Sequence, residues 1–153
     1  MQIQILGQGY EPKSELSVGN QLIKFLSDKE FHSFTAIAAF ASQAGVNGLS
    51  KHINEAKKHI TNFTIVVGVN QKATSKEALD ALNNLDINSY VFFAPPPFPI
   101  FHPKVYLFEG ADKSELIIGS SNITRPGLFS NVELSLLVSI NNHIDEDIKI
   151  INQ

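Results

Sequence analysis

Two almost wholly apolar segments, each followed by a helix-like pattern, constrain the fold of this chain more than any other feature. Residues 34–40 and 63–69 contain one polar side chain each. A strand that is apolar along its whole length belongs in a sheet whose two faces are both covered. The first segment precedes apolar positions at helical spacing in residues 45–56, and the second precedes a helix that Thr74-Ser75 should cap. Another helix is expected within residues 14–27.

The second half of the chain predicts antiparallel strands. Residues 89–93 should form a strand that stops where three prolines follow, because proline donates no ladder hydrogen bond. Residues 102–108 and 116–119, joined by a turn around residues 110–113, have the pattern of a hairpin, and residues 132–138 form the last strand. We therefore predict an α/β fold: a mixed β-sheet flanked by helices on both faces, in an α/β sandwich.

Length and composition fit a single domain over residues 1–153, since 43% hydrophobic residues can bury one sizeable core. Residues 144–153 carry isoleucines at helical spacing and then stop, which suggests the N-terminal part of a longer protein. The lack of cysteine excludes disulfides, thiolate zinc sites and cysteine nucleophiles. No secretory signal or membrane-spanning stretch is visible, so we expect a cytoplasmic protein without a membrane partner.

The charge of the chain argues against duplex binding by this domain alone. The formal net charge is -3, and Arg125 is the single arginine. Affinity for duplex DNA usually comes from clustered lysine and arginine on phosphates. A catalytic module tethered to a separate DNA-binding domain avoids this objection, because the other domain supplies the affinity.

Two pairs of polar residues are placed to meet on the predicted hairpin. His102 and Lys104 are two residues apart, so on a strand both side chains leave the same face. Ser120 and Asn122 share a face of the returning strand in the same way. If the turn centres on Asp112, Lys104 lies opposite Ser120 and His102 opposite Asn122, within about 5.5 Å. We therefore predict that four polar groups converge.

These four groups suit reaction at a phosphodiester. Imidazole can attack phosphorus, while ammonium, hydroxyl and amide donors neutralise charge that grows on the non-bridging oxygens, so no metal or other cofactor is required. The pair His102 and Lys104 alone is a weak signal, because two solvated side chains on a surface strand give the same pattern. The Gly-Ser-x-Asn sequence on the partner strand favours the catalytic interpretation over the interpretation as solvated surface residues.

His102, Lys104, Gly119, Ser120 and Asn122 resemble the His-x-Lys and Gly-Ser-x-Asn signature of the phospholipase D superfamily. The resemblance implies a phospholipase D-like α/β sandwich and phosphodiesterase chemistry. One residue departs from the pattern, because Glu109 stands where the superfamily places an aspartate, on a hairpin longer by three residues. Glu109 falls on the opposite face from Lys104, so we interpret it as a solvated acid.

Glu133 is a better candidate for the acid of the site. It lies on a predicted strand where a lone carboxylate needs a reason, because its neighbours there are mostly apolar: Val132, Leu134, Leu136, Leu137 and Val138. Either the position faces solvent, or Glu133 orients an imidazole of the site and stabilises its cationic form. The sequence leaves both interpretations open.

The spacing of these motifs resembles the motif spacing of the metal-independent restriction endonucleases of the superfamily. The resemblance extends over about residues 34–138. Segments with this likeness are Phe40-Ala41-Ser42, residues 74–79 and residues 101–108. The resemblance implies that His102, Lys104, Asn122 and Glu133 are catalytic, with Ser120 in support. It further implies DNA as the substrate, cleaved through a phosphohistidine intermediate.

The chemistry of the superfamily also implies a homodimer. It uses two histidines, one as nucleophile and one as acid, and this chain carries a single signature. His32, His52, His59 and His143 have no lysine two residues on and no Gly-Ser-x-Asn sequence after them. A two-fold dimer with a shared active site supplies the second histidine.

Some assignments remain open at the level of sequence. Arg125, three residues after Asn122, either holds a flanking phosphate or has a plain surface role. The main hypothesis is a nuclease domain of a restriction or defence-type endonuclease, with a further DNA-recognition or helicase domain in the full-length protein. The alternatives are a phospholipid phosphodiesterase or transphosphatidylase, and a non-catalytic dimerisation or binding module of the same fold.

Overall fold

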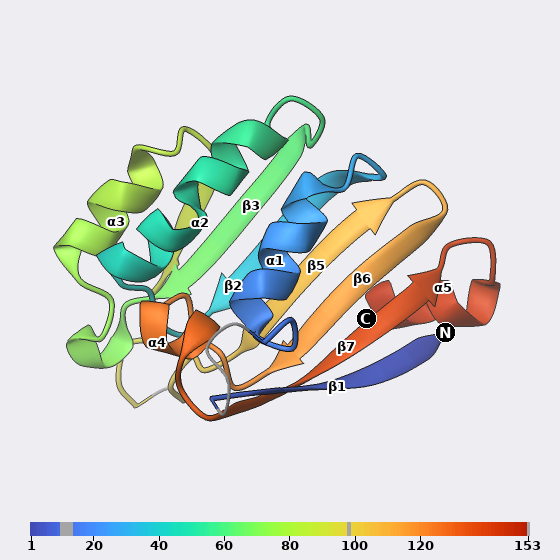
Figure 1. Ribbon diagram of the computed structural model, residues 1–153. Helices are drawn as coiled ribbons and strands as arrows, with labels where there is room; N and C mark the ends of the chain where they lie inside the picture. The colour runs from blue at the N-terminus through green and yellow to red at the C-terminus, as the bar shows by residue number, and fades with distance from the viewer. Residues whose placement is uncertain (10–13, 98, 153) are drawn as a thin grey trace.

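The computed structural model describes residues 1–9, 14–97 and 99–152. These residues form one mixed sheet with helices packed on it (Figure 1). Its strands lie in the order β1-β7-β6-β5-β2-β3-β4. Their bounds are β1 Gln2–Gln8, β2 Phe31–Ala38, β3 Asn62–Gly68, β4 Asn88–Phe92, β5 Lys104–Gly110, β6 Lys113–Gly119 and β7 Glu133–Asn141. The ladders β2–β3 and β3–β4 are parallel, and all the others are antiparallel.

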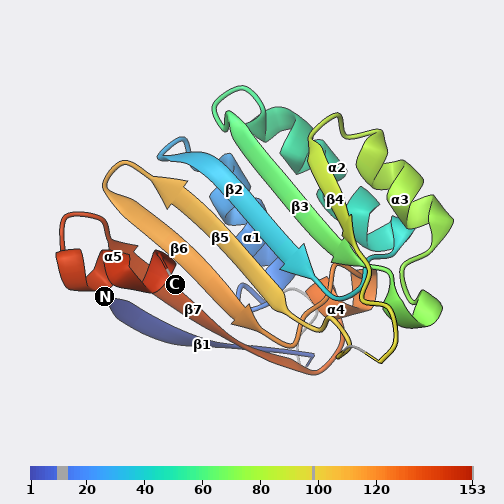
Figure 2. The same ribbon diagram turned by 180° about the vertical axis from the view of Figure 1, so that it is seen from behind.

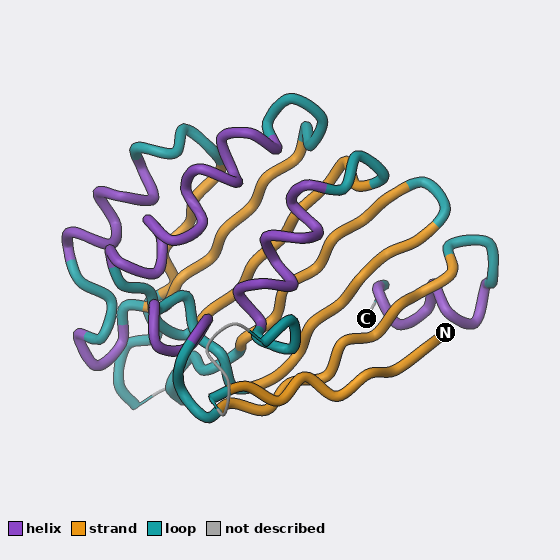
Figure 3. Tube along the Cα trace, viewed as in Figure 1, coloured by secondary structure: helices purple, strands orange, loops and turns teal. Residues whose placement is uncertain are grey.

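Helices lie on both faces of the sheet. Their bounds are α1 Val18–Ser27, α2 Gln43–Ala56, α3 Lys76–Asn83, α4 Arg125–Phe129 and α5 Asp145–Ile151, with a short 3-10 helix at Asn70–Lys72. Helices α1 to α4 cover one face (Figure 3). Helix α5 packs Ile150 and Ile151 against a small cluster of Leu116, Val138 and Ile140. The predicted α/β class, with a mixed sheet and helices on both faces, is confirmed.

The second face of the sheet is covered less completely than the apolar strands predict. Helix α5 shields one corner of it, and five apolar side chains on β1, β6 and β7 stay exposed. They are Ile3, Ile5, Ile118, Leu134 and Leu136. Within the described residues, no helix is both long and apolar enough to cross a bilayer.

Hydroxyl side chains fix where the long helices begin. Ser17, Ser42 and Ser75 each accept a hydrogen bond from a backbone N–H in the first turn of α1, α2 and α3. Such caps satisfy amide groups that have no partner inside the helix. Ser75 confirms the cap predicted from residues 74–75. Thr74 does not cap the helix, because its buried hydroxyl links Ala41 N–H and the Gly68 carbonyl.

Three elements were not predicted: β1, α4 and the short 3-10 helix. Strand β1 pairs with β7 at an edge of the sheet, and its alternating glutamine and isoleucine residues were the available signal. Helix α4 has only five residues and contains Pro126 and Gly127, a pattern that predicts a loop. Proline is nevertheless compatible with the first turn of a helix, where its missing N–H has no intrahelical partner to lose.

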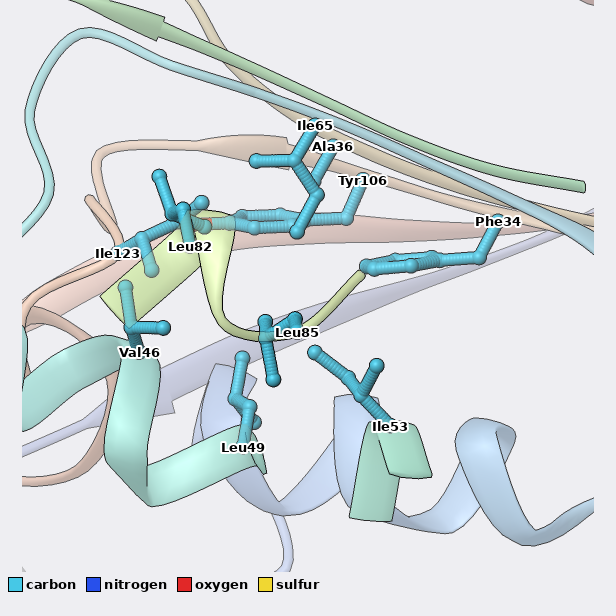
Figure 4. A pocket seen from close by; sticks show the side chains of 10 residues that line it. All are labelled: Phe34, Ala36, Val46, Leu49, Ile53, Ile65, Leu82, Leu85, Tyr106 and Ile123. Carbon is cyan, nitrogen blue, oxygen red and sulfur yellow. The ribbon is translucent and has the colours of Figure 1, made fainter. Parts of the chain in front are cut away.

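The core between the sheet and α1 to α3 is dense and apolar. Phe25, Phe31, Phe34 and Phe108 form a cluster of rings with centroids 4.4 to 5.8 Å apart. The gap that the side chains in Figure 4 enclose is about 10 Å³, between the sheet, α2 and α3. This cavity is too small to hold a substrate, so a substrate must bind at the surface of the protein.

The candidate site residues meet at one edge of the sheet because of the strand directions. Strands β1, β2, β3, β4 and β6 end at this edge, and β5 and β7 begin there (Figure 2). Residues just after the first group and just before the second are therefore neighbours in space. We call this the catalytic edge.

Gly45 provides a test of the packing at this edge. A Cβ atom at Gly45 would lie 2.6 Å from Thr124 Cα and would also collide with the Ile123 carbonyl group. We expect Gly45→Ala to lower the free energy of unfolding by about 1–3 kcal/mol, the usual cost of overpacking. Gly7→Ala is the control, since nothing lies within 4 Å of its Cβ position. Chemical denaturation of both variants measures the effect, and equal stabilities would contradict this packing.

Candidate active site

His102 and Lys104 are in direct contact at the catalytic edge. Lys104 is the first residue of β5, and His102 lies just before it. The Lys104 Nζ atom is 2.7 Å from Nδ1 of the imidazole and 3.2 Å from Nε2, and it donates to the His102 carbonyl oxygen at 3.0 Å. An ammonium group only donates, so the ring nitrogen that faces it must present a lone pair.

Burial changes the ionisation of Lys104. The residue is 6% exposed. This burial lowers the pKa of the ammonium group below its usual value, and the negative charge of Glu133 acts in the opposite direction. The site therefore holds a desolvated cation, which interacts more strongly with a phosphate oxygen than a solvated lysine does.

The hairpin register differs from the predicted one by one residue. The structure pairs Val105 with Ile118, so continuing the ladder brings Lys104 to Gly119 and not to Ser120. The turn between β5 and β6 contains two residues, Ala111 and Asp112, and the hairpin centre falls between them. The prediction placed that centre on Asp112, so its assignment of Lys104 opposite Ser120 and His102 opposite Asn122 is wrong.

Asn122 reaches the edge through a loop, since β6 ends at Gly119. Its Oδ1 atom accepts a hydrogen bond from Phe40 N–H at 3.0 Å. The ring of Phe40 meets the imidazole of His102 edge-on, with centroids 5.8 Å apart. Phe40 thus links the asparagine to the histidine, and it leaves the Nδ2 end of the amide for a substrate oxygen.

Glu133 and Ser120 form the other contact at the edge. Glu133 is the first residue of β7, and its Oε2 accepts a hydrogen bond from Ser120 Oγ. Asn131 Nδ2 donates to the second carboxylate oxygen at 3.2 Å. Glu133 makes no hydrogen bond to a histidine among the residues described, so a role in orienting an imidazole stays a prediction. Within one chain, its negative charge acts on Lys104 and Tyr106.

Tyr106 is a supporting residue that sequence reasoning missed. Its fully buried hydroxyl donates to the Ser121 carbonyl at 2.8 Å. Burial, and to a lesser degree the charge of Glu133, raises the pKa of Tyr106, so the hydroxyl keeps its proton as a donor. Its position two residues after Lys104 on the same strand face was the available signal.

Arg125 and Glu109 occupy different environments. Arg125 is the exposed first residue of α4, and the neighbouring Thr124 caps that helix. Glu109 accepts a hydrogen bond from Ser33 Oγ at 3.0 Å on the face of the sheet opposite Lys104, as its spacing predicted. Within residues 1–9, 14–97 and 99–152, no three acidic or histidine side chains are grouped as metal ligands would be.

Comparison with known families identifies the class of protein. Residues 34–153 match the family described as cardiolipin synthase, PLD-like domain. The match covers more than half of the chain, so the protein belongs to this phospholipase D-like family, which confirms the resemblance inferred from its motifs. No curated protein matches its sequence significantly.

Solved structures support the same fold. Nuc from Salmonella typhimurium, a phospholipase D family member, is 22% identical with a TM-score of 0.59, over 89% of this chain and 81% of Nuc. NucT from Helicobacter pylori is 17% identical with a TM-score of 0.66, over 99% of this chain and 91% of NucT. Yeast tyrosyl-DNA phosphodiesterase is 10% identical with a TM-score of 0.59, over 92% of this chain and 32% of that enzyme. At these identities, the likeness establishes the fold.

The buried position of Lys104 predicts its titration. Because burial disfavours the cation, the ammonium group should lose its proton at a pH below the usual lysine value of 10.5. As the pH rises, the cation of Lys104 should therefore be lost at a lower pH than the cation of an exposed lysine. Nitrogen-detected NMR of the lysine Nζ groups measures this, with Lys104→Arg to assign the signal. A pKa at or above 10.5 would contradict the burial.

Proposed function

We propose that this chain is a metal-independent phosphodiesterase that cleaves DNA through a phosphohistidine intermediate on His102. The observation that carries the proposal is the contact between His102 and the buried Lys104, with Phe40 contacting both the imidazole, through its ring, and Asn122, through its backbone N–H. This arrangement combines a nucleophile with donors for the charge that develops on phosphorus-bound oxygens. Membership of the phospholipase D-like family supports the same chemistry.

The reaction proceeds in two displacements. A ring nitrogen of His102 bonds to phosphorus as the bond to the leaving deoxyribose oxygen breaks, and that oxygen takes a proton from a second, protonated histidine. Water then loses a proton to the second histidine and bonds to phosphorus, while the nitrogen–phosphorus bond breaks. Lys104 and Asn122 stabilise the non-bridging oxygens in both steps, Ser120 and Glu133 set the charge near Lys104, and Arg125 holds a flanking phosphate.

The second histidine comes from another copy of the chain. Among the described histidines, only His102 lies at the catalytic edge with a lysine beside it; His143, for example, pairs with Asp112 in the turn at the other end of the hairpin. A two-fold homodimer brings two catalytic edges together around one shared site. Val132 and Leu134, which flank Glu133, are 69% and 64% exposed, and burial against a second copy would remove them from water.

Two observations support DNA as the proposed substrate. One similar structure is a tyrosyl-DNA phosphodiesterase by name, and the motif spacing resembles that of restriction endonucleases. We place the enzyme in the cytoplasm. The net charge of -3 gives little affinity for duplex DNA, so we assign sequence recognition, or a helicase activity, to a further domain. A phospholipid phosphodiesterase is the second candidate, because the matching family is named for cardiolipin synthase.

A cleavage assay in EDTA tests the chemistry. We expect the protein to cleave DNA, or the small substrate bis(p-nitrophenyl) phosphate, in the presence of the chelator. His102→Ala should lower the rate by roughly a thousandfold or more, because it removes the nucleophile. The matched control is His143→Ala at the far end of the hairpin, which should leave the rate unchanged. A requirement for magnesium would refute the mechanism, and turnover of phosphatidyl substrates alone would favour the second candidate.

Mixed dimers test the shared site. Wild-type and His102→Ala chains are refolded together in equal amounts, so that half of the dimers carry one intact histidine. If both histidines are needed, activity should fall to about one quarter of an all-wild-type sample, whereas independent subunits would retain about one half. Size measurement by light scattering accompanies the assay, and an active monomer would exclude the dimer.

A further inference from the structure

Phenylalanine rings flank His102 on the catalytic edge. Phe101 immediately precedes the histidine, and its ring stacks on that of Phe92 with centroids 4.4 Å apart and planes inclined by 22°. Phe40 contacts the imidazole edge-on. We call Phe92 and Phe101 the aromatic pair. It joins the end of β4 to the segment that carries the nucleophile.

Packing against the fold explains the position of Phe101 but not the exposure of Phe92. Phe101 packs over Gly68, where a Cβ atom would approach its ring to 2.9 Å, so Phe101 helps to hold its segment on the end of β3. Phe92 is 43% exposed, and the next residue, Phe93, is 60% exposed. Exposed rings cost free energy in water, so core packing explains Phe101 but not the open ring of Phe92.

The charge around the site decides what such rings can bind. The cations on described elements at this edge are Lys72, Lys76, Lys104 and Arg125. Lys76 is paired with Asp80, and Lys104 is buried against His102. Duplex DNA and anionic membranes are both held mainly by clusters of exposed lysine and arginine, which this edge does not offer among the described residues. A single strand can be held with fewer cations, because each unpaired base that stacks on an aromatic ring contributes about 1–3 kcal/mol.

We propose that the aromatic pair is a stacking platform for an unpaired base next to the scissile phosphate, and that the substrate is therefore single-stranded DNA. The inference rests on the proposed phosphodiesterase function and adds the strand state of its substrate. Bases in a duplex are stacked inside the helix and cannot reach Phe92. Phe92 pairs with Gly68 and so faces the side of the sheet opposite Lys104. A single strand that passes round the end of β3 can lay an unpaired base on the exposed ring of Phe92 and bring the adjoining phosphate to His102, with Phe101 between them.

Kinetics with one oligonucleotide, single-stranded or annealed to its complement, test the platform. Wild-type protein should cleave the single strand with a lower KM than the duplex. Phe92→Leu keeps an apolar side chain and removes the ring, and it should raise the KM for the single strand roughly tenfold or more with kcat little changed. Phe92→Trp should restore or lower that KM, because a larger ring stacks better. A purely structural role of Phe92 would instead change stability and kcat.

A matched control lies on the same strand. Tyr90 is 57% exposed and lies two residues further from the catalytic edge, so Tyr90→Leu should change the KM much less than Phe92→Leu. Equal or better cleavage of the duplex, or a KM insensitive to Phe92, would overturn the platform while cleavage itself upholds the phosphodiesterase. Loss of binding to cardiolipin-containing vesicles in Phe92→Leu, without an effect on DNA, would also overturn it. If the wild type cleaves no phosphodiester, the underlying function fails first.

Discussion

The site depends on one short stretch of backbone pairing between two loops that are far apart in the chain. Ile123 N–H donates to the Phe40 carbonyl at 3.1 Å, and Ser42 N–H donates to the Ile123 carbonyl at 3.0 Å. These bonds form a parallel bridge between Ala41 and Ile123. They join the loop after β2 to the loop after β6, so that Asn122 lies beside Phe40, whose ring contacts His102.

Several neighbouring features make sense as supports for that bridge. The glycine at position 45 lets the start of α2 approach Ile123 and Thr124 closely. Inside the core, the hydroxyl of Tyr106 donates a hydrogen bond to the adjoining Ser121 carbonyl. The hydroxyl of Thr74 accepts a hydrogen bond from Ala41 N–H and donates one to the Gly68 carbonyl at the end of β3. Hydrogen bonds in so buried a place are costly to break, because the groups left behind find no water.

Electrostatics at the edge follow from the same packing. Lys104 is buried because it begins β5 between the loops that the bridge holds together, and burial works against its positive charge. The nearby Glu133, fixed by Ser120 and Asn131, partly offsets that cost. A phosphate entering the site would supply the negative charge that completes the balance.

Much of the fold could be predicted from sequence because periodicity and turn residues report local structure directly. The apolar strands, the helices that follow them and the hairpin were all visible. Strand β1 and the five-residue α4 were missed, since an edge strand and a short helix carry little pattern. The types of the site residues were also predictable, but the hairpin register was off by one, and the links through Phe40 and Tyr106 depend on tertiary contacts that no spacing rule contains.

The most direct test of the proposed chemistry is to trap the covalent intermediate. The protein is mixed with radiolabelled DNA, quenched within one turnover under alkaline conditions that preserve phosphohistidine, and digested for mass spectrometry. We predict that a nucleotide is bonded through phosphorus to the peptide that contains His102, and that Lys104→Ala reduces the yield. Cleavage that proceeds with no label on His102, or with label on another residue, would contradict this mechanism.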